Sequence, residues 1–365
     1  MNRQLDIELS QNEARVLHSL VKWPNLTDQA IHSQIGMKKS TFSSIKTRLK
    51  ENAYYTRYFL PNFPIIGHEM MMIMFGELNR FTTYEERMRI AKDMLQSFVE
   101  DFHMSSEGNK SFSLSVTQNF TEYSKNQERF FELYQENKFL SKQGMTTVAY
   151  PFELTKLHCF MDYESLIANL FGLASQKYEE RKTIPTGRVN RIKLTRAERK
   201  VLVGLVKYPE ESDTLIAENI GVSRNTVANA KRKFLSKGIC FPRVVPNLEK
   251  LGLNVLNFSY MQYSPRISKE IRMEAIDKVR ETISPFFFVE KNLDGFTISA
   301  HTSREDFETA YDELVGFHAR NEFLREETTS YVMNIADISN IKEYDFLPMT
   351  LKILGFKADK PISDQ

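Results

Sequence analysis

Two segments of this sequence, 38–60 and 223–243, gather side chains that bind polyanions. The first contains six lysines and arginines against one acid and the second six against none, whereas the 365-residue chain has a net charge of only +2. Such local clusters attract the closely spaced phosphates of duplex DNA in a salt-dependent way. We therefore expect double-stranded DNA to be the partner of these segments.

Polar side chains within each segment could read bases, because Arg pairs with guanine and Asn with adenine in the major groove. The expected DNA-binding residues are Lys38, Lys39, Ser40, Ser43, Ser44, Lys46, Thr47, Arg57, Ser223, Arg224, Asn225, Thr226, Asn229, Lys231, Arg232 and Arg243. The two sets differ in type, so they should read different bases, or the first should mainly contact phosphates. The competing interpretation is a solvated basic helix face.

The residues before each basic segment predict the helices that position it. Capping boxes at 10–13 and 195–198 begin a first helix, because each places a hydroxyl residue three positions before a glutamate. A short second helix and a glycine turn at Gly36 or Gly221 follow, and then comes the basic third helix. This is the helix-turn-helix order. The β-rich stretch behind each third helix predicts a wing or a linking strand.

The whole arrangement is written twice. Residues 9–67 align with 194–252 at a constant offset of 185, and the similarity resumes further along at offsets of 184 and 183. A repeat of this length indicates a duplicated domain pair, because solenoid repeats are only about 20–50 residues long. The remainder of each half predicts strand, helix, strand, strand, helix, strand, which is the ferredoxin-like order, and then a terminal helix.

The predicted fold class is therefore α+β, with two tandem copies of a winged helix-turn-helix followed by a ferredoxin-like domain. Asp294-Gly295 and Gly108-Asn109 are the expected hairpin turns between the second and third strands of the two copies. The predicted boundaries are 1–62 and 63–174 for the first copy, 175–193 for a linker, and 194–247 and 248–365 for the second copy.

Composition restricts the function further. Two cysteines cannot build a disulfide framework and fit a reducing cytoplasm, where we expect the protein to reside. We recognise no signal peptide, membrane span, metal motif, phosphate-binding glycine loop or nucleophile motif. None of the seven histidines recurs in the other half, so satisfied core or surface positions explain them best. We expect no catalytic residue, cofactor or metal, and a protein that is not an enzyme.

The second half resembles the leucine-responsive/AsnC (feast–famine) regulators of prokaryotes. The resemblance rests on the helix after Leu194, on Ile216-Ala217, Ile220–Ser223, Thr226-Val227 and Gly238-Ile239, and on the Pro246–Gly252 stretch that leads into a strand. It covers the architecture of both halves and is weaker in detail in the first. It implies a transcriptional regulator whose ferredoxin-like domain serves oligomerisation and effector binding.

That family usually dimerises single units, whereas this chain carries two. We therefore expect the two halves to pair within one chain through their sheets, and we expect a homodimer of the duplicated chain. The family's Gly-x-x-Asp motif is replaced here by 292–296 and 107–112. An amino-acid effector is not supported by these segments, and an effector of another kind stays open.

An enzyme of the same architecture is the alternative. Siroheme decarboxylases resemble AsnC regulators, also occur as two related halves, and use basic and histidine residues around a tetrapyrrole. The corresponding cluster here would be Arg57, His68 and His103. No basic–histidine string follows the third helix, and the basic third helices would be left unexplained, so the regulator is the favoured interpretation.

Overall fold

The computed structural model describes residues 9–94, 97–174, 187 and 190–365. The chain forms two compact units, and each unit combines parts of both sequence halves. The first unit holds Met1–Tyr58, Lys156–Ile184 and Pro242–Ala336, and the second holds Phe59–Thr155, Pro185–Phe241 and Asp337–Gln365. Most of the predicted linker 175–193 lies outside the described residues.

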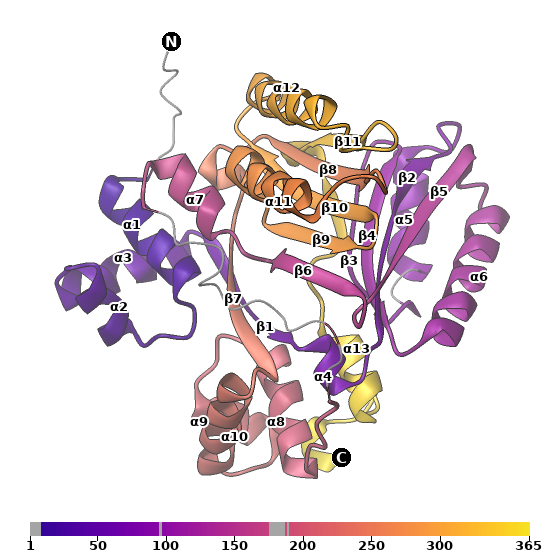
Figure 1. Ribbon diagram of the computed structural model, residues 1–365. Coiled ribbons are helices and arrows are strands. Elements are labelled where there is room, and N and C mark those ends of the chain that lie inside the picture. Colours follow the sequence, from indigo (N-terminus) through magenta and orange to yellow (C-terminus); the bar gives the residue numbers. More distant parts are fainter. Residues whose placement is uncertain (1–8, 95–96, 175–186, 188–189) are drawn as a thin grey trace. The chain divides into compact units, whose positions relative to one another are not determined.

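Three consecutive helices carry each basic segment (Figure 1). Their bounds are α1 Gln11–Lys22, α2 Asp28–Gln34 and α3 Lys39–Glu51 in the first unit, and α8 Arg196–Lys207, α9 Asp213–Ile220 and α10 Arg224–Ser236 in the second. Both predicted capping boxes are confirmed, at Ser10–Glu13 and Thr195–Glu198. The predicted apolar stripe of α10, which consists of Val227, Ala230 and Phe234, is buried. Burial of this stripe leaves the basic side of the helix facing outward.

The strands that follow the third helices are β1 Tyr55–Pro61 and β7 Cys240–Pro246, and they form a two-stranded sheet. Two short terminal helices, α7 Glu164–Phe171 and α13 Leu347–Leu354, pack on α1 and α8 respectively. On α7, the buried Glu164 carboxylate lies 3.0 Å from His18 Nε2 and 3.8 Å from Lys22 Nζ. This charge contact fixes α7 against α1 within the first unit.

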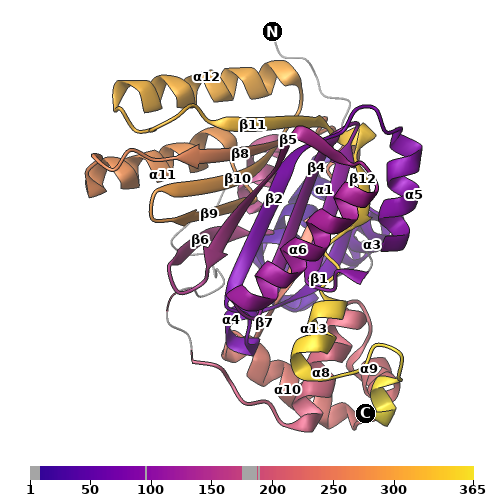
Figure 2. The ribbon, with the colours of Figure 1, turned by 90° about the vertical axis from the view of Figure 1, so that its right-hand side faces the viewer.

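Each unit contains one five-stranded sheet with two helices on one face (Figure 2). In the first unit the order is β11-β8-β10-β9-β6, with α11 Lys269–Ile283 and α12 Arg304–Arg320 packed on it. In the second it is β12-β3-β4-β2-β5, with α5 Tyr84–Met94 and α6 Phe120–Glu136. The strand bounds are β2 Met70–Leu78, β3 Asp101–Glu107, β4 Lys110–Thr117, β5 Leu140–Pro151, β6 Thr155–Phe160, β8 Val255–Gln262, β9 Phe287–Lys291, β10 Asp294–His301, β11 Thr329–Asn334 and β12 Ser339–Lys342. The chain therefore has the expected α+β class.

Strands β6 and β12 correct the predicted strand order. Each follows the last predicted strand of its own half but joins the sheet of the other half, β6 beside β9 and β12 beside β3. The sequence pattern of six and four residues does not specify a partner, because strand pairing is set by contacts that are remote along the chain. We call β6 and β12 the exchanged strands.

One of the two predicted hairpin turns is wrong. Gly108-Asn109 makes the expected turn between β3 and β4, with Gly108 at φ +58°. In the other copy Asp294 already pairs with Lys291, so the turn residues are Asn292 and Leu293. Asn292 has a φ of +46°, a left-handed conformation that asparagine tolerates better than most residues. Gly295 lies inside β10, where its backbone packs against the Tyr263 side chain.

Within the part of the chain that the structure describes, no helix is both long and apolar enough to cross a membrane.

Candidate functional site

The third helices present most of the predicted DNA-binding residues to solvent. Exposed side chains on and beside α3 and α10 are Lys38, Lys39, Ser40, Ser43, Ser44, Thr47, Ser223, Arg224, Asn225, Asn229 and Arg232, and Thr226 is half-buried. The two helices also begin differently, as predicted. Ser223 Oγ accepts a bond from Thr226 N at 3.1 Å, whereas Lys38 makes no side-chain cap.

The remaining four predicted residues are engaged inside the protein. Lys46 Nζ lies 2.7 Å from Asp28 Oδ1, and at the equivalent place in the other copy Lys231 Nζ lies 2.8 Å from Asp213 Oδ1. Each pair ties a third helix to the start of the second helix before it. Arg57 Nη2 donates to the Pro24 carbonyl at 2.8 Å.

Arg243 is the fourth of these residues. Its Nε donates to the Phe160 carbonyl at 3.2 Å, and burial lowers its pKa. The outward-facing basic surface is consequently narrower than the sequence suggested. On α10 the exposed predicted residues are Arg224, Asn225, Asn229 and Arg232.

The histidine cluster considered for a tetrapyrrole is divided between the units. Arg57 belongs to the first unit, and His68 and His103 belong to the second. His103 stacks on Tyr344 with ring centroids 4.8 Å apart. Burial lowers the pKa of both histidines to about 4, so both rings are neutral at pH 7 and make poor ligands for carboxylates.

A different basic–histidine cluster, which sequence reasoning missed, forms in the first unit around Glu290. This carboxylate is 1% exposed and comes from β9. Lys156 Nζ and His158 Nε2 on the exchanged strand β6 both lie 3.5 Å from Oε1, and Arg272 Nε on α11 lies 3.5 Å from Oε2. Arg280 follows Arg272 on α11, and its Nη2 lies 3.1 Å from His158 Nδ1. We call these five residues the Glu290 cluster.

Charge, rather than short hydrogen bonds, holds the Glu290 cluster together. Burial alone raises the pKa of Glu290, but the contact with His158 and the charges of Arg272 and Lys156 outweigh this effect and hold that pKa below its usual range. Glu290 is therefore an anion at neutral pH. Lys156 and Arg272 each lie 3.5 Å from this one carboxylate and Arg280 adds a third positive charge, so the cluster is electropositive as a whole.

The proton position on His158 follows from its partners. An arginine can only donate, so the contact from Arg280 requires an unprotonated Nδ1. The ring proton then lies on Nε2, which faces Glu290. The His158 ring lies tilted against Phe288, with ring centroids 4.5 Å apart, and this contact restricts the plane of the His158 ring. His158 Nε2 therefore carries a proton close to the cationic Lys156. The Lys156 side chain is 67% exposed and links the buried cluster to solvent.

Sequence reasoning missed the Glu290 cluster because its members come from three elements far apart in the chain. The available signal was the alternation of polar and apolar residues through Lys156-Leu157-His158, which is typical of a strand. Among the described residues, no group of three or more His, Cys, Asp or Glu side chains could hold a metal ion. The cations around His158 and Glu290 suit the cluster to binding anions and transferring protons.

Comparison with solved structures gives full-length similarity to one enzyme. The siroheme decarboxylase NirDL shares 8% sequence identity with a TM-score of 0.53, over 94% of this chain and 99% of that one. The same enzyme in complex with an iron-uroporphyrin III analogue gives a TM-score of 0.52 at 8% identity, with the same coverage. An AsnC family transcriptional regulator from Agrobacterium tumefaciens has 17% identity and a TM-score of 0.33 over 38% of this chain and 90% of its own. No protein-family model and no curated protein matches the sequence.

These comparisons correct one expectation from the sequence. The prediction that the chain is not an enzyme is wrong, because a protein that matches its fold over the whole length, the siroheme decarboxylase NirDL, is an enzyme. The architecture that was attributed to a regulator fits the decarboxylase alternative better.

Proposed function

We propose that this protein is an enzyme that binds a tetrapyrrole and removes carboxyl groups from it, in the manner of the siroheme decarboxylases. The observation that carries the proposal is the full-length likeness to siroheme decarboxylase NirDL, which spans both halves of the duplicated chain. The Glu290 cluster supports it, since it supplies the basic and histidine side chains that a substrate rich in carboxylates requires.

The roles of the cluster follow from its chemistry. Lys156 and Arg272 would bind a substrate carboxylate, because their charges exceed that of Glu290 and Lys156 reaches solvent. In a decarboxylation the bond between the carbon chain and the carboxyl group breaks, carbon dioxide leaves, and the electron pair stays on carbon. That carbon then takes a proton from His158 Nε2, and the Lys156 ammonium group, which lies at the same Glu290 oxygen, would return a proton to that nitrogen so that the ring is neutral again. Arg280 and Glu290 hold the His158 ring in the tautomer that can do so.

The test is tetrapyrrole binding and turnover by the purified full-length protein. Siroheme should shift in absorbance on titration with the protein, and carbon dioxide should be released. We expect His158→Gln to keep the absorbance change and to reduce carbon dioxide release by roughly 100-fold, the contribution typical of a positioned acid. Arg272→Gln should weaken binding, and Arg266→Gln, an exposed arginine outside the cluster, is the matched control. Unchanged binding and turnover in both cluster variants would reject the assignment of this site.

A second candidate function is sequence-selective binding of duplex DNA by the three-helix segments, taken as winged helix-turn-helix domains. The exposed Arg224, Asn225 and Asn229 on α10 favour it, because they are side chains that read bases and no described ion pair occupies Arg224. A gel shift with random duplexes, run beside the absorbance titration, separates the two functions. Under this second proposal the effector and the operator sequence are both open, and a homodimer of the chain would present four such segments.

A further inference from the structure

The helix-covered face of the second unit's sheet carries polar residues where an apolar core is expected. Ser113, Ser115 and Thr117 occupy alternate positions of β4, and alternate residues of a strand share a face. Ser113 and Thr117 are buried, at 4% and 2% exposure. Burying hydroxyl groups costs free energy unless they find partners, so this polar stripe needs an explanation.

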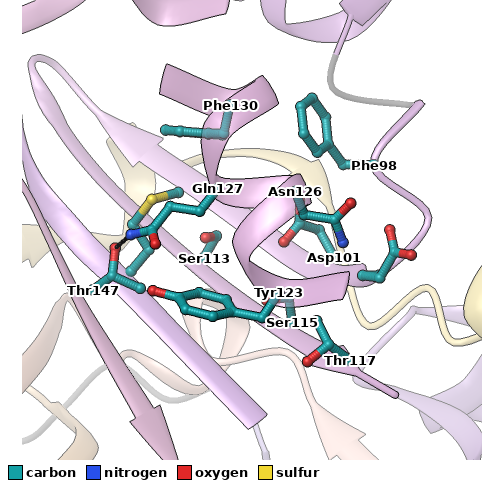
Figure 3. A pocket seen from close by; sticks show the side chains of 12 residues that line it. Phe98, Asp101, Ser113, Ser115, Thr117, Tyr123, Asn126, Gln127, Phe130 and Thr147 are labelled. Atoms are coloured by element: carbon teal, nitrogen blue, oxygen red, sulfur yellow. Dashed lines mark hydrogen bonds between the residues drawn. The ribbon is translucent and has the colours of Figure 1, made fainter. Parts of the chain in front are cut away.

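A cavity of about 50 Å³ lies between this polar stripe and α6 (Figure 3). It is several times the 10–15 Å³ that one water needs, and it has room for a molecule of about four heavy atoms. Its polar lining comes from β4, from Asp101 on β3 and from Asn126 and Gln127 on α6. Its apolar lining includes Phe98 and Phe130.

Two buried atoms in the lining have no hydrogen-bond partner: Thr117 Oγ1 and Asn126 Nδ2. The hydroxyl can accept a bond, and the amide nitrogen can only donate one. Gln127, by contrast, already donates to Thr147 Oγ1 at 3.4 Å, as Figure 3 shows. The cavity therefore offers one acceptor and one donor to an occupant that carries both kinds of group.

The charge of the lining selects a cation. Among the described residues that line the cavity are two carboxylates, Glu100 and Asp101, and no Lys, Arg or His. Glu100 is paired with Lys352. The positive charge that acts on the Asp101 pKa is that of Lys342, on the exchanged strand β12. The hydrogen bond of Lys342 Nζ goes elsewhere, to the Phe98 carbonyl at 2.6 Å. Asp101 is left with a bond from Ser115 and no described ion pair.

We propose that this cavity binds a small amino alcohol of the ethanolamine class. Its ammonium group would lie between Asp101 and Thr117, and its hydroxyl oxygen would accept a bond from Asn126. The two-carbon spacer would contact Phe98 and Phe130. This site is independent of the Glu290 cluster, which lies in the other unit, so either proposal can fail without the other.

The second copy of the domain shows that the site is specific to one half. Asn257, Ser259 and Thr297 make a similar polar lining against α12, around a cavity of about 20 Å³. The described residues that line it include no carboxylate. Pro285 stands where the offset of 184 places the counterpart of Asp101. We therefore expect one binding site per chain.

The experiment is isothermal titration of the full-length protein with ethanolamine at pH 8, backed by ligand-observed NMR. We expect saturable binding with a stoichiometry of one. Propylammonium, which lacks the oxygen, should bind several-fold more weakly, and ethylene glycol, which lacks the charge, should not bind. Asp101→Asn should weaken ethanolamine binding roughly tenfold or more, because a charge-assisted bond is lost. Glu132→Gln, an exposed acid on α6, is the matched control and should leave binding unchanged.

Binding should also weaken below pH 7, since burial raises the pKa of Asp101 to about 7, against the opposing charge of Lys342 and with a further rise from Glu100. If Asp101→Asn does not fold, Ser115→Ala replaces it and should weaken binding several-fold. Equal affinity in the folded Asp101 or Ser115 variant and in the control would overturn the proposal. So would the absence of saturable binding, which would mean that the cavity holds only water.

Discussion

His158 Nε2 lies 3.5 Å from Glu290 Oε1, although the two residues belong to different halves of the duplicated sequence. The contact exists because β6 leaves its own half and becomes the edge strand beside β9. The proposed proton donor, His158, is therefore placed by the exchanged strand β6. The contact between His158 and Glu290 should affect both the proposed decarboxylation and the stability of the first unit.

Removing the Glu290 charge should destabilise the first unit. Glu290→Gln would leave Arg272 and His158 without their buried counter-charge, which we expect to lower the free energy of unfolding by about 3 kcal/mol. Urea denaturation followed by circular dichroism measures this change. Glu313→Gln, which breaks the surface pair with Lys278, is the control and should cost less than about 1 kcal/mol. Equal losses would show that the cluster has no special role in stability.

Buried His103 should make the protein less stable in acid. Its pKa is lowered to about 4 in the folded chain, whereas an unfolded histidine titrates near 6.5. Between these values the unfolded state binds the proton first, so stability is full above pH 6.5 and falls as the pH drops towards 4, by about 3 kcal/mol in the limit. Denaturation midpoints from pH 8 to 4 measure the slope.

In that series, His103→Phe should make the acid side of the curve less steep, and His68, whose pKa burial also lowers to about 4, accounts for part of the slope that remains. His32→Phe, on the half-buried side of α2, is the control and should keep it. Parallel curves for the native chain and the His103 variant would contradict the assignment. Asp101 acts with the opposite sign, because its raised pKa makes the folded state lose stability as the pH rises from about 4 to about 7.

Gly295 is a packing requirement of β10. A Cβ at this position would lie 1.8 Å from the Tyr263 hydroxyl and 2.6 Å from its ring carbon Cζ, and Tyr263 is 2% exposed. Gly295→Ala should therefore lower the free energy of unfolding by about 1–3 kcal/mol, as overpacking does. Gly316→Ala, in the interior of α12 with only Arg320 Nη1 at 3.4 Å, should instead stabilise by about 0.5–1 kcal/mol. Thermal denaturation of both variants would show opposite signs, and a neutral Gly295 variant would refute the packing argument.

For the second candidate function, replacing Arg224, Asn225 and Asn229 together by alanine should relax base preference. The expected cost is about 1–3 kcal/mol for each good base contact. Selection from random duplexes, followed by binding titrations at two salt concentrations, tests this. Arg266→Ala on the first unit is the control. If the triple variant selects the same sequences with the same affinity, α10 is not a reading helix.

The helices could be predicted because their signals lie within a few residues of one another. Contacts between residues far apart in the sequence could not be predicted in this way. The capping boxes and the apolar stripe of α10 are short-range patterns, and both were confirmed. Short-range patterns misplaced the second hairpin turn, because Asp294-Gly295 is a common turn sequence. The structure shows that Gly295 is needed instead to leave room for the Tyr263 side chain. The Glu290 cluster lay beyond such reasoning, since Lys156 and His158 acquire Arg272 as a neighbour only when β6 crosses to the other sheet.

The exchanged strands have a consequence for how this chain can be divided. A sequence repeat does not correspond to a compact unit of the structure, because each unit takes one edge strand, β6 or β12, from the other repeat. A gene cut between the repeats would encode two polypeptides, each with an unfilled sheet edge that invites aggregation. Produced together, the two polypeptides could complement each other and rebuild both bodies. The two copies can therefore diverge in sequence, as the cavity next to Asp101 and its counterpart have done. Neither copy contains all the strands of a complete sheet, so we expect that neither folds properly without the other.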